Sequence, residues 1–513
     1  MSEVSIAQHY HQRTKYDPET IASKNRGLDW HRQPSPYKEY PVGKVVDLKP
    51  YLQDNQQDNQ GNNSGNLGDL NTLGDLGQRL SRLLLLTYGL TAKIPTLSPE
   101  PQYLRAAPSA GGLYPAEIYL ISRGTDLLPM GLYNYQVQRH TLIQFWDSDG
   151  WSKLQAATFA HPLLDATNIA LVITAVFYRS AWRYEDRAYR RIFLDTGHLL
   201  GNLELAANLQ GFRPYLIGGF ADQQVNELLY LDPEQEGAIA IVPLLDQQNQ
   251  SSLPPILSAL PSPIDIHYPQ LKEGELLAYL HEKTQIPPTP RPQILPQLES
   301  VDKYNFPFCT KVATATPPIH WEPESLESTI LKRRSTRTYT GEDLTLEELL
   351  GLLDFTYHPE HYSDQGLDAQ PDYFDLDLVQ TFIAVSGVVG LEEGCYYYAP
   401  HSEELRQIRF KNFRQELHYL CLGQDLARDA AVVVFHTVNL ATAIAKWGDR
   451  AYRYLHMDAG HLGQRLNVGA IYLNLGVSGI GGFFDDQVND ILGIPPEEAV
   501  LYITTLGRPR RVQ

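Results

Sequence analysis

The chain has 513 residues and a formal net charge of −18, and it is 43% hydrophobic and 20% charged. This composition is too apolar for a disordered chain, and the length suffices for two or three domains. The acidic balance argues against a general nucleic-acid binder, because such a protein needs a basic surface. No stretch approaches the ~18 apolar residues of a membrane span, and the first residues lack the apolar core of a signal peptide. We therefore expect a cytoplasmic protein with no nucleic-acid and no membrane partner.

Two segments of unusual composition divide the chain. Residues 52–78 are rich in Asn, Gln, Gly and Asp, which predicts a flexible loop. Residues 246–298 are rich in proline, which excludes long helices and central strands and predicts a linker. The expected organisation is an N-terminal extension with its loop at 1–79, a first domain at 80–245, a Pro-rich linker at 246–325, and a second domain at 326–513.

The two predicted domains share an internal repeat. The block "EDRAYRRIFLDTGHLL" begins at Glu185, and "GDRAYRYLHMDAGHLG" begins 263 positions later, at Gly448. The same offset superposes "IGGFADQQVNELL" from Ile217 on "IGGFFDDQVNDIL" from Ile480, and "GLYNYQ" on "GCYYYA". The chain is therefore interpreted as a tandem duplication of one domain.

Each copy is predicted to mix helices and strands. Apolar runs predict strands at Ala116–Ser122, Ala170–Tyr178, Ala430–Val438 and Val500–Gly507. Apolar residues recur at helical spacing in Asp186–Gln210 and Asp449–Leu475, which predicts long helices packed in the core or between the domains. Asp222 and Asp485 occupy the same repeat position, so we expect both to be structural, for example as helix caps.

Three short motifs are candidates for ligand contact. Arg333–Arg337, "RRSTR", precedes a predicted helix, and its arginines and hydroxyl can hold a phosphate, although a solvated basic run remains an alternative. Pro108–Pro115, "PSAGGLYP", lets backbone amides approach a flat ring or an anion, although it can equally be a turn. Ile480–Phe483, "IGGF", can expose a backbone N–H. The sequence has no cluster with metal-ligand spacing, so we expect no metal.

Together, the motifs "RRSTR", "PSAGGLYP", "RAYR…DAGHL" and "IGGF" resemble those of the nitroreductase superfamily of FMN enzymes, and most closely those of the SagB/ThcOx-type azoline dehydrogenases. The resemblance implies an α+β fold, in which helices surround a mostly antiparallel sheet in each of the two tandem nitroreductase-like domains. It also implies that two copies pair through their long helices and bind FMN between them. The two domains would then form an intramolecular pseudo-dimer, so that one chain can act as a monomer and further dimerisation stays open.

The repeat indicates which of the two interfaces keeps a complete site. At the offset of 263, "PSAGGLYP" falls on Pro371–Leu378, "PDYFDLDL", where the small residues are lost. Alignment of the following helices places Arg333–Arg337 over Ser64–Gly68, and Arg508 falls on Leu245. Three acids of the altered loop are expected to repel a phosphate there: Asp372, Asp375 and Asp377. We therefore predict one FMN per chain, bound by the loop of the first domain and the arginines of the second.

Residue roles follow from the resemblance. The residues expected to bind the cofactor are Arg333, Arg334, Ser335, Arg337 and Arg508 at the phosphate and ribityl chain, Pro108, Ser109, Ala110 and Gly111 along the ring, and Ile480, Gly481 and Gly482 near the flavin N5. The azoline dehydrogenases carry a Lys-Tyr pair before the long helix, where this chain has Lys446-Trp447 and Arg183-Tyr184. The catalytic candidates are therefore Tyr184, Arg183 and Lys446, and the alternative is that they are ordinary residues at a helix start.

The resemblance implies an FMN-dependent oxidoreductase that oxidises azoline rings in peptide-derived or other small substrates, with hydride transfer to the flavin N5. One alternative is a nitro- or quinone reductase, with NAD(P)H or another electron carrier as its partner. Another is a flavin-binding protein that has lost turnover, because neither copy keeps the complete Lys-Tyr pair.

Overall fold

The computed structural model describes residues 4–19, 21, 27–52, 75–95, 101–247, 258–289, 301–322 and 325–510. Most of the loop predicted at 52–78, including Ser64–Gly68, lies outside these ranges. None of the helices in the described ranges has both the length and the apolar character that a membrane span requires.

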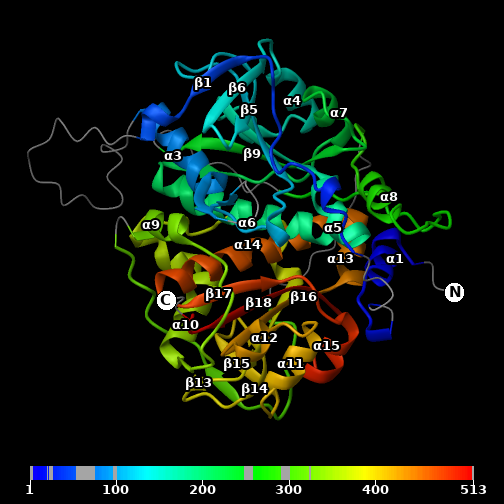
Figure 1. Cartoon of the computed structure of the whole chain (residues 1–513), viewed down its shortest axis with the longest axis vertical. Helices are drawn as coiled ribbons and strands as arrows, with labels where there is room; N and C mark the ends of the chain where they lie inside the picture. The colour runs from blue at the N-terminus through cyan, green and yellow to red at the C-terminus, as the bar shows by residue number, and fades with distance from the viewer. Residues whose placement is uncertain are drawn as a thin grey trace, which may run out of the picture.

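The molecule consists of two sheets with a layer of helices between them (Figure 1). The two long helices α6 (Ala188–Leu209) and α14 (Ala451–Tyr472) lie side by side in the middle layer. We call residues 4–247 the front repeat and residues 258–510 the back repeat; their large sheets lie above and below this layer in Figure 1. The hydrophobic core is continuous from one repeat to the other through these helices.

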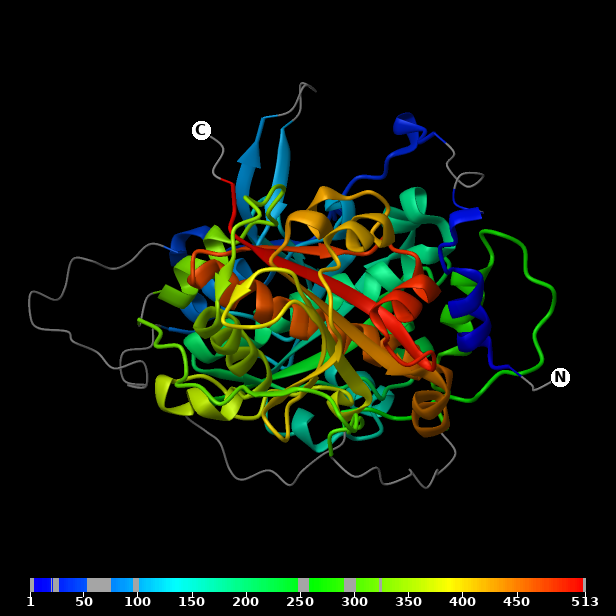
Figure 2. The same ribbon diagram turned by 90° about the horizontal axis from the view of Figure 1, so that it is seen from below.

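The front repeat contains the elements up to β9. Its helices are α1 (Ile6–Arg13), α3 (Leu76–Tyr88), α4 (Trp151–Ala157), α5 (Phe177–Tyr184), α6 and α7 (Asp222–Leu228). Its strands are β1 (Lys44–Asp47), β2 (Leu90–Ile94), β3 (Gln102–Arg105), β4 (Ala116–Ser122), β5 (Gly131–Gln136), β6 (Thr141–Trp146), β7 (Ile169–Val176), β8 (Phe212–Pro214) and β9 (Glu236–Asp246). The β2–β3 hairpin projects from the body of the molecule in Figure 2.

The back repeat contains the remaining elements. Its helices are α8 (Leu276–Lys283), α9 (Ser325–Lys332), α10 (Leu346–Tyr357), α11 (Arg414–Leu420), α12 (Asp425–Asp429), α13 (Leu440–Trp447), α14 and α15 (Asp485–Leu492). Its strands are β10 (Lys311–Ala313), β11 (Leu344–Thr345), β12 (Val379–Val385), β13 (Val388–Val389), β14 (Gly394–Ala399), β15 (Glu404–Arg409), β16 (Val432–Asn439), β17 (Gly476–Ile480) and β18 (Glu498–Gly507).

The two large sheets have the same topology. Their seven strands run in the orders β1-β6-β5-β4-β7-β9-β8 and β10-β15-β14-β12-β16-β18-β17, and every pair in them is antiparallel. The α+β fold with two tandem domains, predicted from the sequence, is confirmed.

The repeat extends into the segments that precede each domain. His11 and Thr14 at the end of α1 correspond to His281 and Thr284 at the end of α8, at an offset of 270. Each large sheet also begins with an edge strand from such a segment, β1 in one repeat and β10 in the other. Part of the predicted extension and part of the predicted linker are therefore structured pieces of the two repeats.

The predicted helical stripe is buried, since Ile192, Leu199, Leu203 and Ala206 of α6 are at most 1% exposed. One strand prediction is wrong at its end: β7 stops at Val176, and the rest of Ala170–Tyr178 forms the first turn of α5. The apolar run continues because Phe177 packs into the same core as the strand, so the hydrophobic pattern does not mark the change.

Two buried clusters of ionic side chains join the repeats. Asp485 of the back repeat lies 2.9 Å from Arg187 and 2.6 Å from Arg190 of the front repeat. Reciprocally, Asp222 of the front repeat lies 2.7 Å from Arg450 and 2.8 Å from Arg453 of the back repeat. All six side chains are at most 4% exposed.

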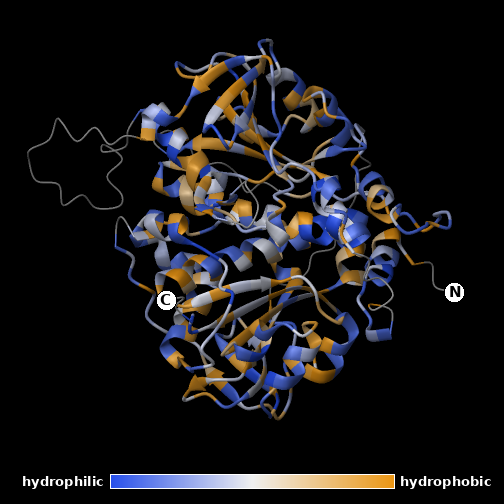
Figure 3. Cartoon of the chain, viewed as in Figure 1, coloured by the Kyte–Doolittle hydropathy of each residue, from blue (hydrophilic) through white to orange (hydrophobic). Residues whose placement is uncertain are grey.

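The predicted structural role of Asp222 and Asp485 takes the form of these ion pairs, not of helix caps. Each aspartate is the first residue of its helix, and neither helix has a side-chain cap. Figure 3 is consistent with this arrangement, because hydrophilic and hydrophobic residues are mixed in the helical layer between the sheets.

We predict that Asp485→Asn lowers the free energy of unfolding by about 3–5 kcal/mol, because it leaves two buried guanidinium groups without a counter-charge. Chemical denaturation of the full chain measures this change. Asp486→Asn is the matched control: the Asp486 side chain is 68% exposed and pairs with Lys15, so its loss should cost about 0–1 kcal/mol. Equal effects of the two substitutions would contradict the role assigned to the buried cluster.

Candidate functional site

The structure brings two of the motifs together: Pro108–Pro115, which we call the front loop, and the arginines of Arg333–Arg337, which we call the back arginines. Arg333 is 2% exposed, and its Nε donates a hydrogen bond of 2.7 Å to the carbonyl of Ala106, two residues before Pro108. Its Nη2 donates to the carbonyl of Arg105 at 3.2 Å, whereas its Nη1 is buried with no hydrogen-bond partner. We call this contact region between Pro108–Gly112, Arg333–Arg337 and Ile480–Gly482 the first interface.

The charge of Arg333 is incompletely satisfied. Burial, together with the neighbouring Arg334 and Arg337, lowers the pKa of the guanidinium to about 10. An anion at the free Nη1 would supply both the missing hydrogen-bond acceptor and the missing counter-charge. The arrangement therefore suits a ligand that carries a phosphate or a carboxylate.

A buried carboxyl group on α6 holds the front loop in place. Asp195 accepts hydrogen bonds from the hydroxyl of Ser109 at 2.6 Å and from the backbone N–H of Ala110 at 3.1 Å. Burial raises the pKa of Asp195 to about 7, although these two hydrogen bonds oppose the shift. The Ser109 hydroxyl also accepts a hydrogen bond from the N–H of Tyr114, so it is engaged within the loop.

Tyr184 and Arg183 lie beside the same loop. Gly111 has a φ of +67°, and a Cβ atom there would lie 2.8 Å from the Tyr184 hydroxyl and 3.5 Å from Arg183 Cδ. Only glycine leaves room for this close approach. The two predicted catalytic residues of the front repeat therefore lie within the first interface.

The "IGGF" segment faces α6 across the first interface. A Cβ on Gly481 would lie 3.4 Å from Nε of Arg191, which in turn places its guanidinium carbon 3.8 Å from the centre of the Tyr184 ring. Gly482, together with Arg183, Tyr184 and Arg191, lines a cavity of about 1180 Å³. The cavity is bounded by both repeats and by residues between α1 and β1, and we call it the interface cavity.

The other arginines predicted to bind phosphate differ in whether their side chains already have hydrogen-bond or ion-pair partners. Arg334 is held by the hydroxyl and carbonyl of Thr91 in β2, and Arg508 forms a two-point ion pair of 2.7 and 2.8 Å with Glu348. Arg337 is exposed and has no partner within the described residues. Arg337 is therefore the cation of this motif that can most readily turn to a ligand.

The equivalent contact region, which we call the second interface, is filled by side chains. A Cβ on Gly218, the counterpart of Gly481, would lie 2.5 Å from the ring of Phe374 and 2.6 Å from the ring of Tyr454. These two rings stack with their centres 4.8 Å apart, and Tyr373 stacks on His461 at 4.4 Å. Tyr373 and Phe374 occupy the repeat positions of Ala110 and Gly111.

Two of the three acids of the altered loop, Asp372 and Asp375, are paired with cations within the chain. Asp372 lies 3.0 Å from Arg213, and Asp375 lies 2.7 Å from Lys446 and accepts a hydrogen bond from Trp447 Nε1. Lys446, the third predicted catalytic residue, therefore lies at the second interface and not beside Tyr184. The second interface therefore differs from the first because aromatic side chains fill it, and not because it carries unpaired negative charge.

Two further sets of residues were compared from the sequence: the counterparts of Arg333–Arg337 and of Arg508 at the second interface. Ser64–Gly68 lies outside the described residues. Leu245, the counterpart of Arg508, is 3% exposed in β9 and offers no charge.

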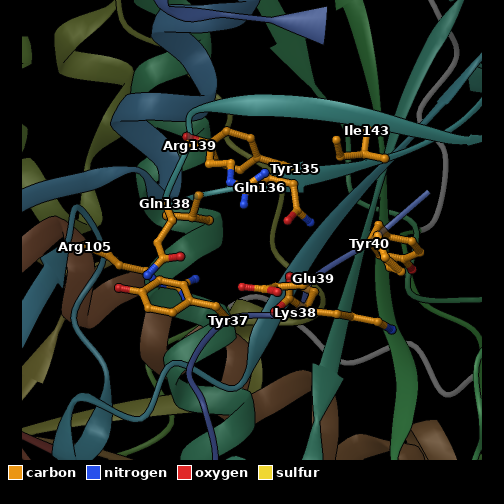
Figure 4. A pocket seen from close by; sticks show the side chains of 13 residues that line it. Tyr37, Lys38, Glu39, Tyr40, Arg105, Tyr135, Gln136, Gln138, Arg139 and Ile143 are labelled. Atoms are coloured by element: carbon orange, nitrogen blue, oxygen red, sulfur yellow. The ribbon is translucent and has the colours of Figure 1, made fainter. Parts of the chain in front are cut away.

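A smaller cavity of about 260 Å³ lies in the front repeat, and none of the predicted site residues lines it. Figure 4 shows Tyr37, Arg105 and Gln138 gathered at one end of it. The Arg105 guanidinium lies 4.4 to 5.5 Å from the rings of Tyr37, Tyr88 and Tyr114. This packing fixes Arg105, whose carbonyl group is one of the two that bind Arg333.

Sequence analysis did not identify Asp195 and Arg191. Asp195 recurs as Asp458, whose pKa burial likewise raises to about 7, so the shared "D-x-G-H" pattern was an available signal. Arg191 corresponds to Tyr454, so only a comparison of the two repeats, residue by residue, could have drawn attention to it.

Comparison with known proteins agrees with this arrangement. The model of the nitroreductase family matches residues 79–244 and 330–508. A crystal structure from Anabaena variabilis, of a protein named as a nitroreductase, is 63% identical and superposes with a TM-score of 0.91, covering 99% of this chain and 100% of that one. MJ1384 of Methanocaldococcus jannaschii, also named as a nitroreductase, is 32% identical over 187 residues, 36% of this chain and 92% of that protein.

Two further relatives are named as processing proteins, one for trifolitoxin and one for microcin B17. The trifolitoxin-processing protein TfxB of Rhizobium leguminosarum is 33% identical over 31% of this chain, and the microcin B17-processing protein McbC of Escherichia coli is 28% identical over 26%. These matches span about half the length of each relative, 44% of TfxB and 52% of McbC. Because the family model matches one segment in each repeat and together they cover more than half of the sequence, the chain belongs to the nitroreductase family of oxidoreductases.

Proposed function

We propose that the chain is an FMN-dependent oxidoreductase that binds a single flavin at the first interface. The observation that carries the proposal is the geometry of Arg333. Two of its nitrogen atoms donate hydrogen bonds to the carbonyls of Arg105 and Ala106, just before the front loop, and the third is buried without a partner. A buried polar group without a partner is costly, so this atom favours an anionic ligand between the repeats.

The residues of the first interface fit FMN. Arg333, with Arg337 nearby, would hold the phosphate, and the loop at Pro108–Gly111 offers a surface of small side chains for a flat ring. Gly481 and Gly482 bring backbone close to the same place without a side chain in the way. When bound, FMN supplies the two-electron redox chemistry, while this chain binds it, orients it and excludes part of the solvent.

Two features support one flavin per chain. The first interface has an unsatisfied cation beside a glycine-containing loop, whereas the second interface has aromatic side chains at the matching positions. A flavin at the second interface would have to displace Tyr373 and Phe374 and would meet the paired Asp372 and Asp375. The larger cost of that rearrangement favours the first interface.

For the substrate, we propose a peptide-derived azoline ring that is oxidised to an azole. The relatives named for trifolitoxin and microcin processing support a peptide, and the interface cavity of about 1180 Å³ is large enough for a peptide segment. A reductase driven by NAD(P)H is the second candidate, supported by the similarity to MJ1384 over 92% of that protein.

Arg337→Ala is predicted to weaken FMN by about 1.5–3 kcal/mol, the scale of a hydrogen bond to a charged group, or roughly 10- to 150-fold in Kd. Fluorescence titration of the flavin-free chain measures the change. Arg333→Ala should show a similar loss, together with some loss of stability, because it also removes the bonds to the front loop. Arg139→Ala is the control, since this exposed residue lines the smaller cavity; a similar loss there would argue against a phosphate site at Arg333–Arg337.

The reaction is tested with two substrate pairs on the FMN-loaded chain. We expect a thiazoline-containing dipeptide to be oxidised to the thiazole in the presence of dioxygen, with a mass loss of two hydrogens. We expect slow turnover of NADPH with a quinone. Fast NADPH turnover without thiazoline oxidation would reject the dehydrogenase in favour of the reductase, and a chain that binds no flavin would reject both.

A further inference from the structure

Tyr16, which follows α1, is one of the side chains that line the interface cavity. Its backbone N–H donates a hydrogen bond of 3.0 Å to Asp485, and the residue forms a β-bridge with Phe484. The buried ionic cluster therefore fixes Tyr16 beside the "IGGF" segment. Its ring atom Cε2 lies 3.8 Å from the position that a Cβ on Gly482 would take, and Tyr16 lines the cavity.

Arginines of α6 and of the turn before it surround the phenol. The guanidinium carbon of Arg187 lies 4.1 Å from the centre of the Tyr16 ring, and Arg191 lines the same cavity, near enough for its charge to lower the pKa of the phenol. Arg187 and Arg190 share the single carboxylate of Asp485, so this group of three keeps a net positive charge. Arg191 is 6% exposed, makes no ion pair with a carboxylate in the described part of the chain, and keeps its Nη1 without a hydrogen-bond partner.

This environment favours the ionised phenol. Burial alone would raise the pKa of Tyr16, but the positive charges of Arg191 and Arg187, with a smaller contribution from Arg190, outweigh it and lower the pKa from its usual value of 10.0. The acid that approaches this group, Asp485, contacts its backbone and is itself engaged by two arginines.

The second interface shows that the fold does not require this phenol. At the position equivalent to Tyr16, Ile286 donates its N–H to Asp222 at 2.9 Å and forms a β-bridge with Ala221. The backbone geometry is the same, yet the side chain is aliphatic. Likewise, Tyr454 takes the place of Arg191 there. The Tyr16–Arg191 pair therefore occurs only beside the interface that is open to a ligand.

We propose that Tyr16 is the acid–base residue of the reaction and that Arg191 is the positioning residue that orients its hydroxyl. The inference rests on the proposed function and deepens it. The substrate class is a ring with an acidic C–H next to a carbonyl, as in a peptide azoline. The Tyr16 oxygen takes that proton, and the hydrogen on the neighbouring carbon leaves as hydride to the oxidised FMN, so the substrate loses two electrons and two hydrogens and gains a double bond. Dioxygen, the external acceptor, would then take up the two electrons and two protons to give hydrogen peroxide. One of these protons comes from the transferred hydride, and the other comes from water, to which Tyr16 returns its proton.

The first test does not need flavin. The near-ultraviolet absorbance of tyrosinate is titrated with pH in the flavin-free full chain, and the curve of Tyr16→Phe is subtracted from that of the wild type. The difference should titrate below the ordinary range of tyrosine, and in Arg191→Gln it should shift upward. A difference curve at or above the ordinary range would overturn the inference.

The second test uses the FMN-loaded chain and the thiazoline dipeptide. Tyr16→Phe keeps the ring and the backbone bonds, so it should bind FMN normally and remain reducible by dithionite. We expect its oxidation rate to fall about 10²–10⁴-fold, the usual contribution of a positioned acid or base. The wild-type rate should rise with pH as the phenol ionises, and this rise should be absent in Tyr16→Phe.

Tyr230→Phe is the control, because Tyr230 is 59% exposed and does not line the interface cavity; its rate should match the wild type. A wild-type rate in Tyr16→Phe, or an equal loss in both variants, would overturn the role of Tyr16. A wild-type chain that holds flavin but leaves the thiazoline unchanged would overturn the substrate class. Failure to bind flavin at all would instead refute the proposed function, and the titration would still report on the phenol.

Discussion

The reciprocal burial of arginines against an aspartate of the other repeat is the constraint on which the rest of this structure depends. Two guanidinium groups and one carboxylate meet in each of two clusters, at Asp485 and at Asp222, where the helices α6 and α14 begin. Removing such charges from water is costly, and the cost is offset only when the geometry satisfies nearly every donor. Backbone carbonyls at the ends of α1 and α8, those of Thr14 and Thr284, accept further hydrogen bonds from these arginines, whereas Nε and Nη2 of Arg187 have no hydrogen-bond partner among the described residues.

This requirement couples distant parts of the sequence. The segment after α1 is held against Asp485, and the segment after α8 is held against Asp222, so each crosses from one repeat to the other. The same clusters set the relative position of the front loop, the back arginines and the "IGGF" segment. The interface is thus fixed by buried polar geometry as well as by apolar packing, and a small shift between the repeats would break several charge-assisted bonds at once.

On this symmetric scaffold, a few substitutions make the two interfaces different. Ala110 and Gly111 in one correspond to Tyr373 and Phe374 in the other, and Arg191 corresponds to Tyr454. Large aromatic rings fill the space that glycine and alanine leave open, and they add packing where no ligand is needed. A duplicated chain can therefore concentrate its chemistry at one interface and use the other for cohesion between the repeats.

The sequence predicted the duplication, the antiparallel α+β fold and the proximity of Arg333 to the Pro108 loop, because these depend on motifs that recur or pair at a fixed offset. It did not predict the pairing of Asp372 and Asp375 with cations, since a list of charges does not show which of them are neutralised by neighbours. Tyr16 was not identified from the sequence for a different reason. Its counterpart lies at an offset of 270 and not 263, in a segment whose prolines suggested only a linker.

The central claim is that a single flavin lies between the repeats, and the molar ratio of flavin to protein tests it most directly. The full chain is saturated with FMN, freed of excess cofactor and denatured, and the released flavin is quantified against protein. The account predicts a ratio near one. A ratio near two would mean that the aromatic side chains of the second interface do not exclude the cofactor, and a ratio near zero would contradict the assignment of a flavin site.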